Sequence, residues 1–292
     1  MFVRYGKILF FISMFFVAVS LAALAVFGLN VGIDFTGGSI MEVSYENERP
    51  TVEEVQDILS EFELGSSYVQ PVGENGMLIR TPFLAEDMHQ QVLSALGENV
   101  SEMRFEAIGP VIGRELRSKV LMMTLLALLA IVLYIIIAFR RIAEPLQSWH
   151  YSIAAVVALL HDLLIPIGVF AFLGAYYGVQ FTIPVVVGLL TVLGYSINDT
   201  VVVFDRIREN LRRKEGTSFQ DTVNISLRQT ILRSLSTSFT TLLVLVSIFV
   251  LGGETLRYFA LALIIGVVAG TYSSLFVAPP LLLILARLRR RG

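Results

Sequence analysis

The chain has 292 residues, of which 55% are hydrophobic and 16% charged, and its mean hydropathy is +0.74. Soluble domains carry about a quarter charged residues, so this composition argues against a soluble protein and indicates several membrane-spanning helices. The lack of cysteine excludes disulfides, thiolate metal sites and cysteine nucleophiles.

Six stretches are long and apolar enough to cross a bilayer, which takes about 20 residues. They are 8–29, 120–139, 150–173, 181–203, 231–251 and 257–286. The last contains Pro279 and Pro280, so we expect its helix to end or bend there. Ala23-Leu24-Ala25 resembles a signal-peptide cleavage site, but the apolar run before it exceeds the usual ~7–15 residues. We therefore expect the first span to be retained.

Charge is distributed unevenly along the chain. Residues 30–119 hold 16 of the 24 acidic and 6 of the 22 basic residues, a net of −10, whereas the rest has a net of +8. The basic residues outside this block flank the first, second, fourth and sixth spans; they include Arg4, Lys7, Arg140, Arg141, Arg206, Arg208, Arg212, Arg213, Lys214, Arg287, Arg289, Arg290 and Arg291. Because Lys and Arg concentrate on the cytoplasmic side of membranes, we expect both termini inside and the acidic block outside.

Three segments follow from this orientation. We predict a first span with a cytoplasmic N terminus at 1–29 and an extracytoplasmic domain at 30–118. The remaining five spans and a cytoplasmic C terminus would occupy 119–292.

The predicted outer domain reads strand, helix, strand, strand, helix, strand. The strands are 39–46, 67–71, 76–81 and 100–107. The first helix begins near Val52, and the second spans 85–96 and is followed by Gly97, a typical helix stop. This order is typical of a ferredoxin-like α+β fold.

Two local patterns support these elements. Thr51 with Glu54 three residues later forms a capping box. Alternation predicts that Met41, Val43 and Tyr45 share one face of the first strand, and that Met103, Phe105 and Ala107 point inward from the last. No His/Asp/Glu cluster has metal-ligand spacing, so we expect a partner-binding or purely structural domain rather than an enzyme.

Polar residues inside the fourth span lie on one helical stripe. At 3.6 residues per turn, one arc of about 100° holds Gly188, Thr191, Tyr195, Asn198, Asp199, Val202 and Arg206. Lipid does not satisfy polar groups, so we expect this stripe to face protein or water. A central Asp costs about 2.5–3.5 kcal/mol to insert, which favours a functional role.

The fifth span has a similar stripe, made of Arg233, Ser236, Thr237, Thr240, Val244 and Ser247. Arg233 and Asp199 are expected at similar depth near the cytoplasmic side. A protonatable Asp next to a permanently charged Arg would change its proton affinity as the helices move, which is the basis for proton transport. The simpler alternatives are an Arg233 that snorkels to the headgroups and an Asp199 held in a static ion pair.

Two further features lie in other spans. His161 and Asp162 in the third span form either a proton relay or a satisfied polar contact. Gly266 and Gly270 form a GxxxG pattern in the sixth span, which indicates close helix packing and no chemistry.

Six motifs together resemble the SecD/SecF family of bacterial protein-export membrane proteins, within the resistance-nodulation-division (RND) superfamily. They are VGIDFTGGSIMEV at 31–43, IGPVIGRELR at 108–117, LLHDLLIPIG at 159–168, TVLGYSINDTVVVFDRIREN at 191–210, SLRQTILRSLSTSFTTLL at 226–243 and GTYSSLFVAPPL at 270–281.

This resemblance implies a six-helix RND-type half-unit in the bacterial inner membrane, with the small domain between the first and second spans. It implies pairing with SecD, a similar six-span subunit, and work with the SecYEG translocon on unfolded preproteins. The proton-motive force would drive a late, outer-side step of export. The family's transport Asp falls on Asp199 and its essential Arg on Arg233, while a third acid would come from SecD.

The expected proton-transport residues are therefore Asp199, Arg233, Asn198, Thr237, Asp162 and His161, with no metal, cofactor or nucleic acid. Two alternatives stay open. One is half of another RND-type proton-coupled exporter, which its single small outer domain disfavours. The other is a scaffold that moves no ions, which the cost of the polar stripes disfavours. On the residues alone, the coupling ion is H⁺ or Na⁺.

Overall fold

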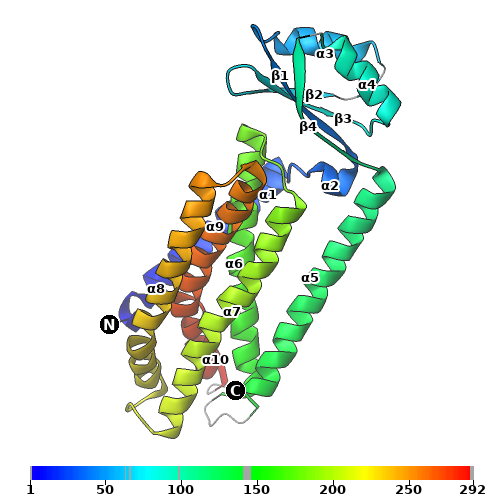
Figure 1. The fold of residues 1–292 in the computed structure, drawn as a ribbon. Coiled ribbons are helices and arrows are strands. Elements are labelled where there is room, and N and C mark those ends of the chain that lie inside the picture. The colour runs from blue at the N-terminus through cyan, green and yellow to red at the C-terminus, as the bar shows by residue number, and fades with distance from the viewer. Residues whose placement is uncertain (1, 63, 66, 98, 141–145, 290–292) are drawn as a thin grey trace. The chain divides into compact units, whose positions relative to one another are not determined.

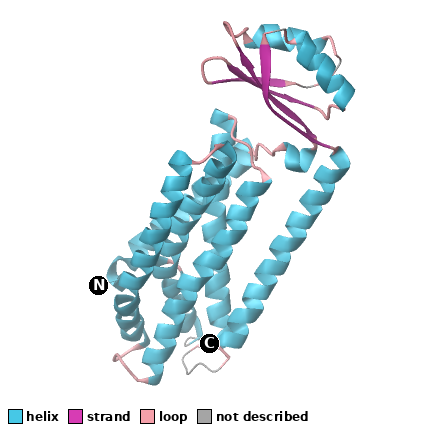
Figure 2. Cartoon of the chain, viewed as in Figure 1, coloured by secondary structure: helices cyan, strands magenta, loops and turns pink. Residues whose placement is uncertain are grey.

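The computed structural model describes residues 2–62, 64–65, 67–97, 99–140 and 146–289. The chain divides into two compact units. One comprises residues 31–122, and the other comprises residues 1–30 together with 123–292. Figures 1 and 2 show their helices and strands.

Six segments of the described chain have the length and hydropathy of membrane spans, which confirms the predicted number. Their helices are α1 (Phe2–Phe27), α5 (Pro110–Ala138), α6 (Ser148–Tyr177), α7 (Ile183–Arg212), α8 (Phe219–Leu251), and α9 (Glu254–Phe276) followed by α10 (Ala278–Arg289). Several helices continue past the predicted apolar stretch, because polar residues extend the same helix. The largest extension is that of α8, which begins twelve residues before the predicted span at 231.

The sixth span is interrupted as predicted. α9 ends at Phe276, and α10 begins at Ala278. Pro279 and Pro280 lie in the first turn of α10, where a proline ring needs no amide partner. The double proline therefore starts a new helix.

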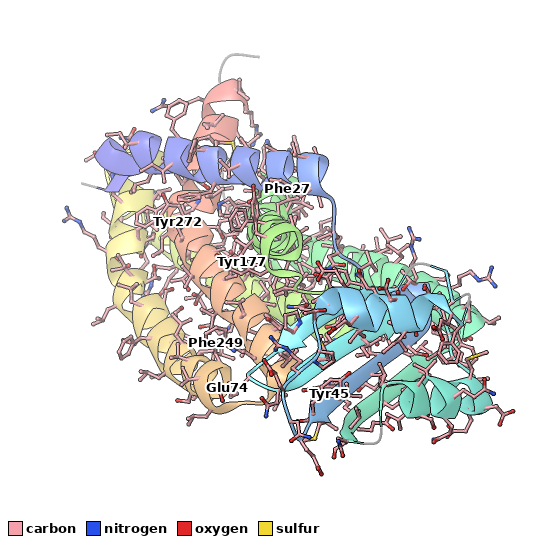
Figure 3. The ribbon with its side chains drawn as sticks, turned by 90° about the horizontal axis from the view of Figure 1, so that it is seen from above. Phe27, Tyr45, Glu74, Tyr177, Phe249 and Tyr272 are labelled. Atoms are coloured by element: carbon pink, nitrogen blue, oxygen red, sulfur yellow. The ribbon has the colours of Figure 1, made fainter. Side chains whose placement is uncertain are left out.

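Small residues set how closely the helices of this unit approach one another. α7 packs along α9, and α1 packs along α6. A Cβ atom on Gly188 of α7 would lie 3.2 Å from the Phe259 carbonyl oxygen of α9. Tyr272 of α9 donates a hydrogen bond to the Leu9 carbonyl of α1 at 2.7 Å, and Figure 3 shows its side chain between these two helices.

The other unit contains a four-stranded antiparallel sheet in the order β2-β3-β1-β4. Its elements are α2 (Ile33–Thr36), β1 (Gly38–Tyr45), α3 (Val52–Ser60), β2 (Tyr68–Val72), β3 (Gly76–Thr81), α4 (Glu86–Ala95) and β4 (Val100–Ile108). The core is formed by one face of the sheet together with α3 and α4. This order and pairing confirm the predicted ferredoxin-like fold.

The local signals in this unit are largely confirmed. Met41, Val43 and Tyr45 are all buried. Thr51 and Glu54 bond reciprocally, with Glu54 N donating to Thr51 Oγ1 at 3.2 Å and Thr51 N donating to Glu54 Oε2 at 2.8 Å. Gly97 follows α4 with a φ of 122°, a conformation that suits glycine.

The prediction for the last strand is partly wrong. Phe105 packs against the core, but Met103 is 66% exposed and Ala107 is exposed as well. The pairing with β1 shifts between Glu42 and Val43, so Met103 has no partner residue and forms a β-bulge. The bulge places Glu102 opposite Val43, and its Oε1 lies 3.1 Å from Nε2 of buried His89.

Candidate functional site

Asp199 lies on the buried side of α7, with a side chain that is almost fully enclosed at 5% exposure. Its Oδ2 atom has no hydrogen-bond partner among the residues that the structure describes. A buried acceptor without a donor costs about 1–3 kcal/mol. Asp199 is therefore not a satisfied structural residue in this chain.

Two residues of α8 face this carboxyl group. Ser234 interacts most directly, and Arg233 adds Coulomb attraction. Ser234 is fully buried, and its Oγ has no hydrogen bond within normal geometry in the described part of the chain. Arg233 is exposed, and no ion pair between it and Asp199 occurs within residues 2–140 and 146–289 as described. The structure thus places both predicted residues near each other without the static pair considered above.

The two predicted stripes divide into inward and outward members. On α7, Asp199 is buried while Thr191 and Asn198 are exposed. On α8, the whole stripe is exposed, namely Arg233, Ser236, Thr237, Thr240, Val244 and Ser247. Most of the two stripes therefore lies on the outer surface of the chain. The exceptions are on α7, where Asp199 and Gly188 are buried and Tyr195, Val202 and Arg206 are partly buried.

Most hydroxyls in these stripes already have partners in their own helix. Thr191 donates to the Val187 carbonyl at 2.8 Å, and Thr237 donates to the Arg233 carbonyl at 2.9 Å. These bonds need no neighbouring protein. The expectation that the entire stripe must face protein or water is thus too broad, and it applies most strongly to the Asn198 amide and the Arg233 guanidinium.

Asp162 forms a fully buried junction of three helices. Its Oδ1 bonds to Nδ1 of His161 at 2.7 Å, and its Oδ2 accepts from Ser273 of α9 at 2.8 Å and from Ser196 of α7. His161 Nε2 is also buried and lacks a hydrogen-bond partner within the described chain. The carboxyl group of Asp162 is thus well satisfied, in contrast to that of Asp199.

Ser196 brings this junction close to Asp199. The two residues are three apart on α7 and so lie on neighbouring turns of one helix face. A second polar link runs beside it, because Tyr195 Oη donates to Ser238 Oγ at 3.2 Å and Ser238 bonds to Thr271 at 2.5 Å. Polar side chains of α6, α7, α8 and α9 thus meet around one stretch of α7.

Four hydroxyl residues of this site were not predicted from the sequence, namely Ser196, Ser234, Ser238 and Thr271. Ser273 was assigned only to a small-residue stripe. Their spacing gave one usable signal, since Ser234 and Ser238 lie one turn apart on a face of α8 that adjoins its predicted stripe. Which helix they meet depends on tertiary packing.

Gly266 and Gly270 lie against the same part of α7. A Cβ atom on Gly266 would overlap Val192, and one on Gly270 would lie 2.9 Å from the Ser196 Cβ. Ser273, about one turn after Gly270 on α9, bonds to Asp162 beside this contact.

The described residues contain no group of three His, Asp or Glu side chains able to hold a metal ion. The site contains carboxyl, imidazole and hydroxyl groups, which can bind, release and pass on protons, and a guanidinium group that keeps its positive charge.

Comparison with known proteins gives a consistent result. The family model "Protein export membrane protein SecD/SecF, C-terminal" matches residues 88–288, and the "SecD/SecF GG Motif" matches residues 22–48. The "Protein translocase subunit SecF" of Thermobaculum terrenum is 39% identical over 296 residues, covering 96% of this chain and 92% of that protein. That of Vibrio alginolyticus is 38% identical, covering 97% and 88%.

Solved structures agree with these matches. The crystal structure of SecDF from Thermus thermophilus is similar with a TM-score of 0.84 and 32% identity over 97% of this chain. SecDF in a super-membrane-facing form gives a TM-score of 0.70 at 31% identity. This chain spans only 38% of the former SecDF chain and 39% of the latter.

Proposed function

The chain belongs to the SecD/SecF family of protein-export membrane proteins, as the SecF subunit of translocon-associated SecDF machinery. We propose that it uses the proton-motive force to promote preprotein translocation at a late, outer-side stage. Asp199 carries this proposal, because it is a buried carboxyl group whose Oδ2 has no partner in the described chain.

Each predicted transport residue has a role in this proposal. Asp199 binds and releases the proton, and the nearby positive charge of Arg233 favours its ionised form when the two approach. Asn198 and Thr237 lie on the exposed stripes beside them and line the route to water. His161 and Asp162 supply a buried polar connection to Ser196, one turn from Asp199.

The proposed partner in the membrane is SecD. Arg233 and Asn198 are exposed on apolar helices, where lipid would leave both groups unsatisfied. A second six-span subunit would cover them and complete a twelve-helix unit, in line with the 38% of the SecDF chain that this chain spans. SecYEG and unfolded preproteins are the proposed partners in export.

The proposed orientation places both termini in the cytoplasm and the α/β unit outside. It is supported by the placement of Lys and Arg, because 16 of the 22 lie outside residues 30–119 and most of these flank the spans on the side predicted to be cytoplasmic. The α/β unit would then be the part that meets the emerging preprotein.

The test is release of a preprotein from membrane vesicles under an imposed proton gradient. We expect Asp199→Asn and Arg233→Met to abolish the gradient-dependent part of release. Glu209→Gln is the matched control, because it removes a carboxylate of the same helix whose ion pairs, in the described part of the chain, are with Arg206 and Arg213 near the surface. Gradient-dependent release that persists in both site variants would favour the scaffold alternative.

A further inference from the structure

Helix α5 is held to the rest of its unit at one end only. Between Met123 and Ala138 just one side chain, Ile135, is fully buried, and the large apolar residues before it are mostly exposed. In Figure 1 this part of α5 runs apart from α6 and α7 and approaches them at its C-terminal end. Whatever positions α5 in this unit must therefore act near residue 138.

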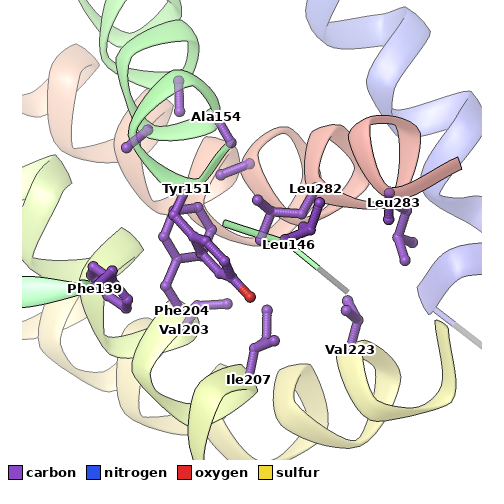
Figure 4. Close-up of a cluster of buried hydrophobic side chains, with 14 of the residues drawn as sticks. Phe139, Leu146, Tyr151, Ala154, Val203, Phe204, Ile207, Val223, Leu282 and Leu283 are labelled. Atoms are coloured by element: carbon purple, nitrogen blue, oxygen red, sulfur yellow. The ribbon is translucent and has the colours of Figure 1, made fainter. Parts of the chain in front are cut away.

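An aromatic group forms the first part of that attachment. The Phe139 ring stacks on Tyr151 of α6 with centroids 5.6 Å apart and planes 2° apart, and meets Phe204 of α7 edge-on at 6.0 Å. Figure 4 shows these three rings within a buried apolar cluster. Ser148, the first residue of α6, donates to the Phe139 carbonyl at 2.6 Å.

Arg208 of α7 forms the second part. Its Nη1 donates to the Ala138 carbonyl at 3.2 Å, and its guanidinium lies 5.7 Å from the Phe139 ring centroid. An ion pair with Asp205, one turn earlier on α7, orients the same guanidinium. A cation at the last carbonyls of a helix is favourable, because the C-terminal end of the helix dipole is negative.

Arg208 lies nine residues after Asp199 on one continuous helix, about 13 Å along its axis. At its other end α5 follows β4 after a single residue, Gly109. Gly113 in its first turns is packed against the backbone of Gly37, where a Cβ would approach within 2.7 Å. The first turns of α5 therefore belong to the α/β unit, and the rest of α5, from Met123 on, belongs to the helical unit.

We propose that Arg208 is a positioning residue that makes the C-terminal end of α5 move with α7, the helix that carries Asp199. This inference rests on the proposed function for its purpose, but its structural content can be tested separately. It assigns Arg208 a role beyond that of a positive charge at a helix end.

The test uses paired spin labels, which the natural lack of cysteine makes straightforward. We would place labels at Leu125→Cys on α5 and Phe172→Cys on α6, both exposed, in the full chain reconstituted with its SecD partner. We expect one narrow distance distribution for wild type, a broadened and shifted one for Arg208→Met, and recovery in Arg208→Lys, which keeps the charge and a donor. Arg213→Met is the matched control, since Arg213 follows α7 directly and its one ion pair among the described residues is with Glu209 of α7, at 2.7 Å.

Transmission is tested by adding Asp199→Asn. We expect this substitution to shift the Leu125–Phe172 distance when Arg208 is present and to leave it unchanged in the Arg208→Met background. The proposal is overturned if Arg208→Met leaves the distribution narrow, if Arg213→Met broadens it equally, or if the Asp199→Asn shift is absent or independent of Arg208. Failure of the proposed function would give another result. Wild-type preprotein release would then not respond to the proton gradient, while the Leu125–Phe172 distance distribution would still depend on Arg208.

Discussion

Asp199 and Asp162 are two buried carboxyl groups in neighbouring helices with opposite surroundings. Asp162 has donors on both oxygens, from His161, Ser196 and Ser273. Asp199 Oδ2 has none within the described chain. A group with every position filled holds helices together, whereas a group with an open position is free to change partners. This difference separates a structural from a working role more clearly than burial does.

We predict that the two matching amide substitutions affect stability differently. Asp162→Asn replaces an acceptor oxygen by an NH₂ group facing hydroxyl donors, and should lower the free energy of unfolding by about 1–3 kcal/mol. Asp199→Asn should leave it nearly unchanged. Thermal unfolding of the purified chain in detergent measures both, and equal melting temperatures would contradict the assignment of Asp162 as a junction.

At the level of elements, small residues determine how α9 lies on α7. Gly266 faces Val192, and Gly270 faces Ser196. Gly194 of α7 is the natural contrast, since a Cβ there would meet nothing within 4 Å.

We predict that Gly266→Ala destabilises the chain by about 1–3 kcal/mol, because the added methyl group must push α7 and α9 apart. Gly194→Ala should be neutral or stabilising, by up to about 1 kcal/mol, because alanine favours the helix. Unfolding of the isolated chain in denaturant compares the two. A Gly266→Ala variant as stable as Gly194→Ala would show that the helices adjust without penalty.

The first long helix of the α/β unit has a pH-dependent start. The hydrogen bond from Thr51 N lowers the pKa of Glu54 below its ordinary value. Since the folded pKa lies below the unfolded one, the stabilisation is present above the unfolded value and is lost as the pH falls through the folded value. We predict that amide protection at Val52–Ser60 decreases as the pH drops below about 4.3, the ordinary Glu value. Glu54→Gln should abolish this pH dependence, and an unchanged profile in that variant would assign it to another group.

Elements were predictable where the signal lies within one segment. The number of spans, the capping box at Thr51, the break next to Pro279 and the succession of strands and helices along the α/β unit all follow from local periodicity and side-chain chemistry. The bulge at Met103 did not, because it is set by pairing with β1. For the same reason Ser196 and Ser273 were missed, since a serine's partner across a helix interface is not encoded in the period of its own helix.

The whole molecule has two kinds of exposed membrane surface. Much of it, including α5, is apolar and suits lipid. The part around Asn198 and Arg233 does not, and it borders the buried Asp199. We infer that the chain is one half of a working unit whose second half covers this polar surface.

The most direct test of this view is proton flux in liposomes that contain the chain together with SecD, with a pH gradient imposed across the bilayer. We predict flux for wild type and for Glu209→Gln, and none for Asp199→Asn, with the same amount of assembled complex in all three. Flux that persists in Asp199→Asn would contradict the assignment of Asp199 as the residue that carries the proton.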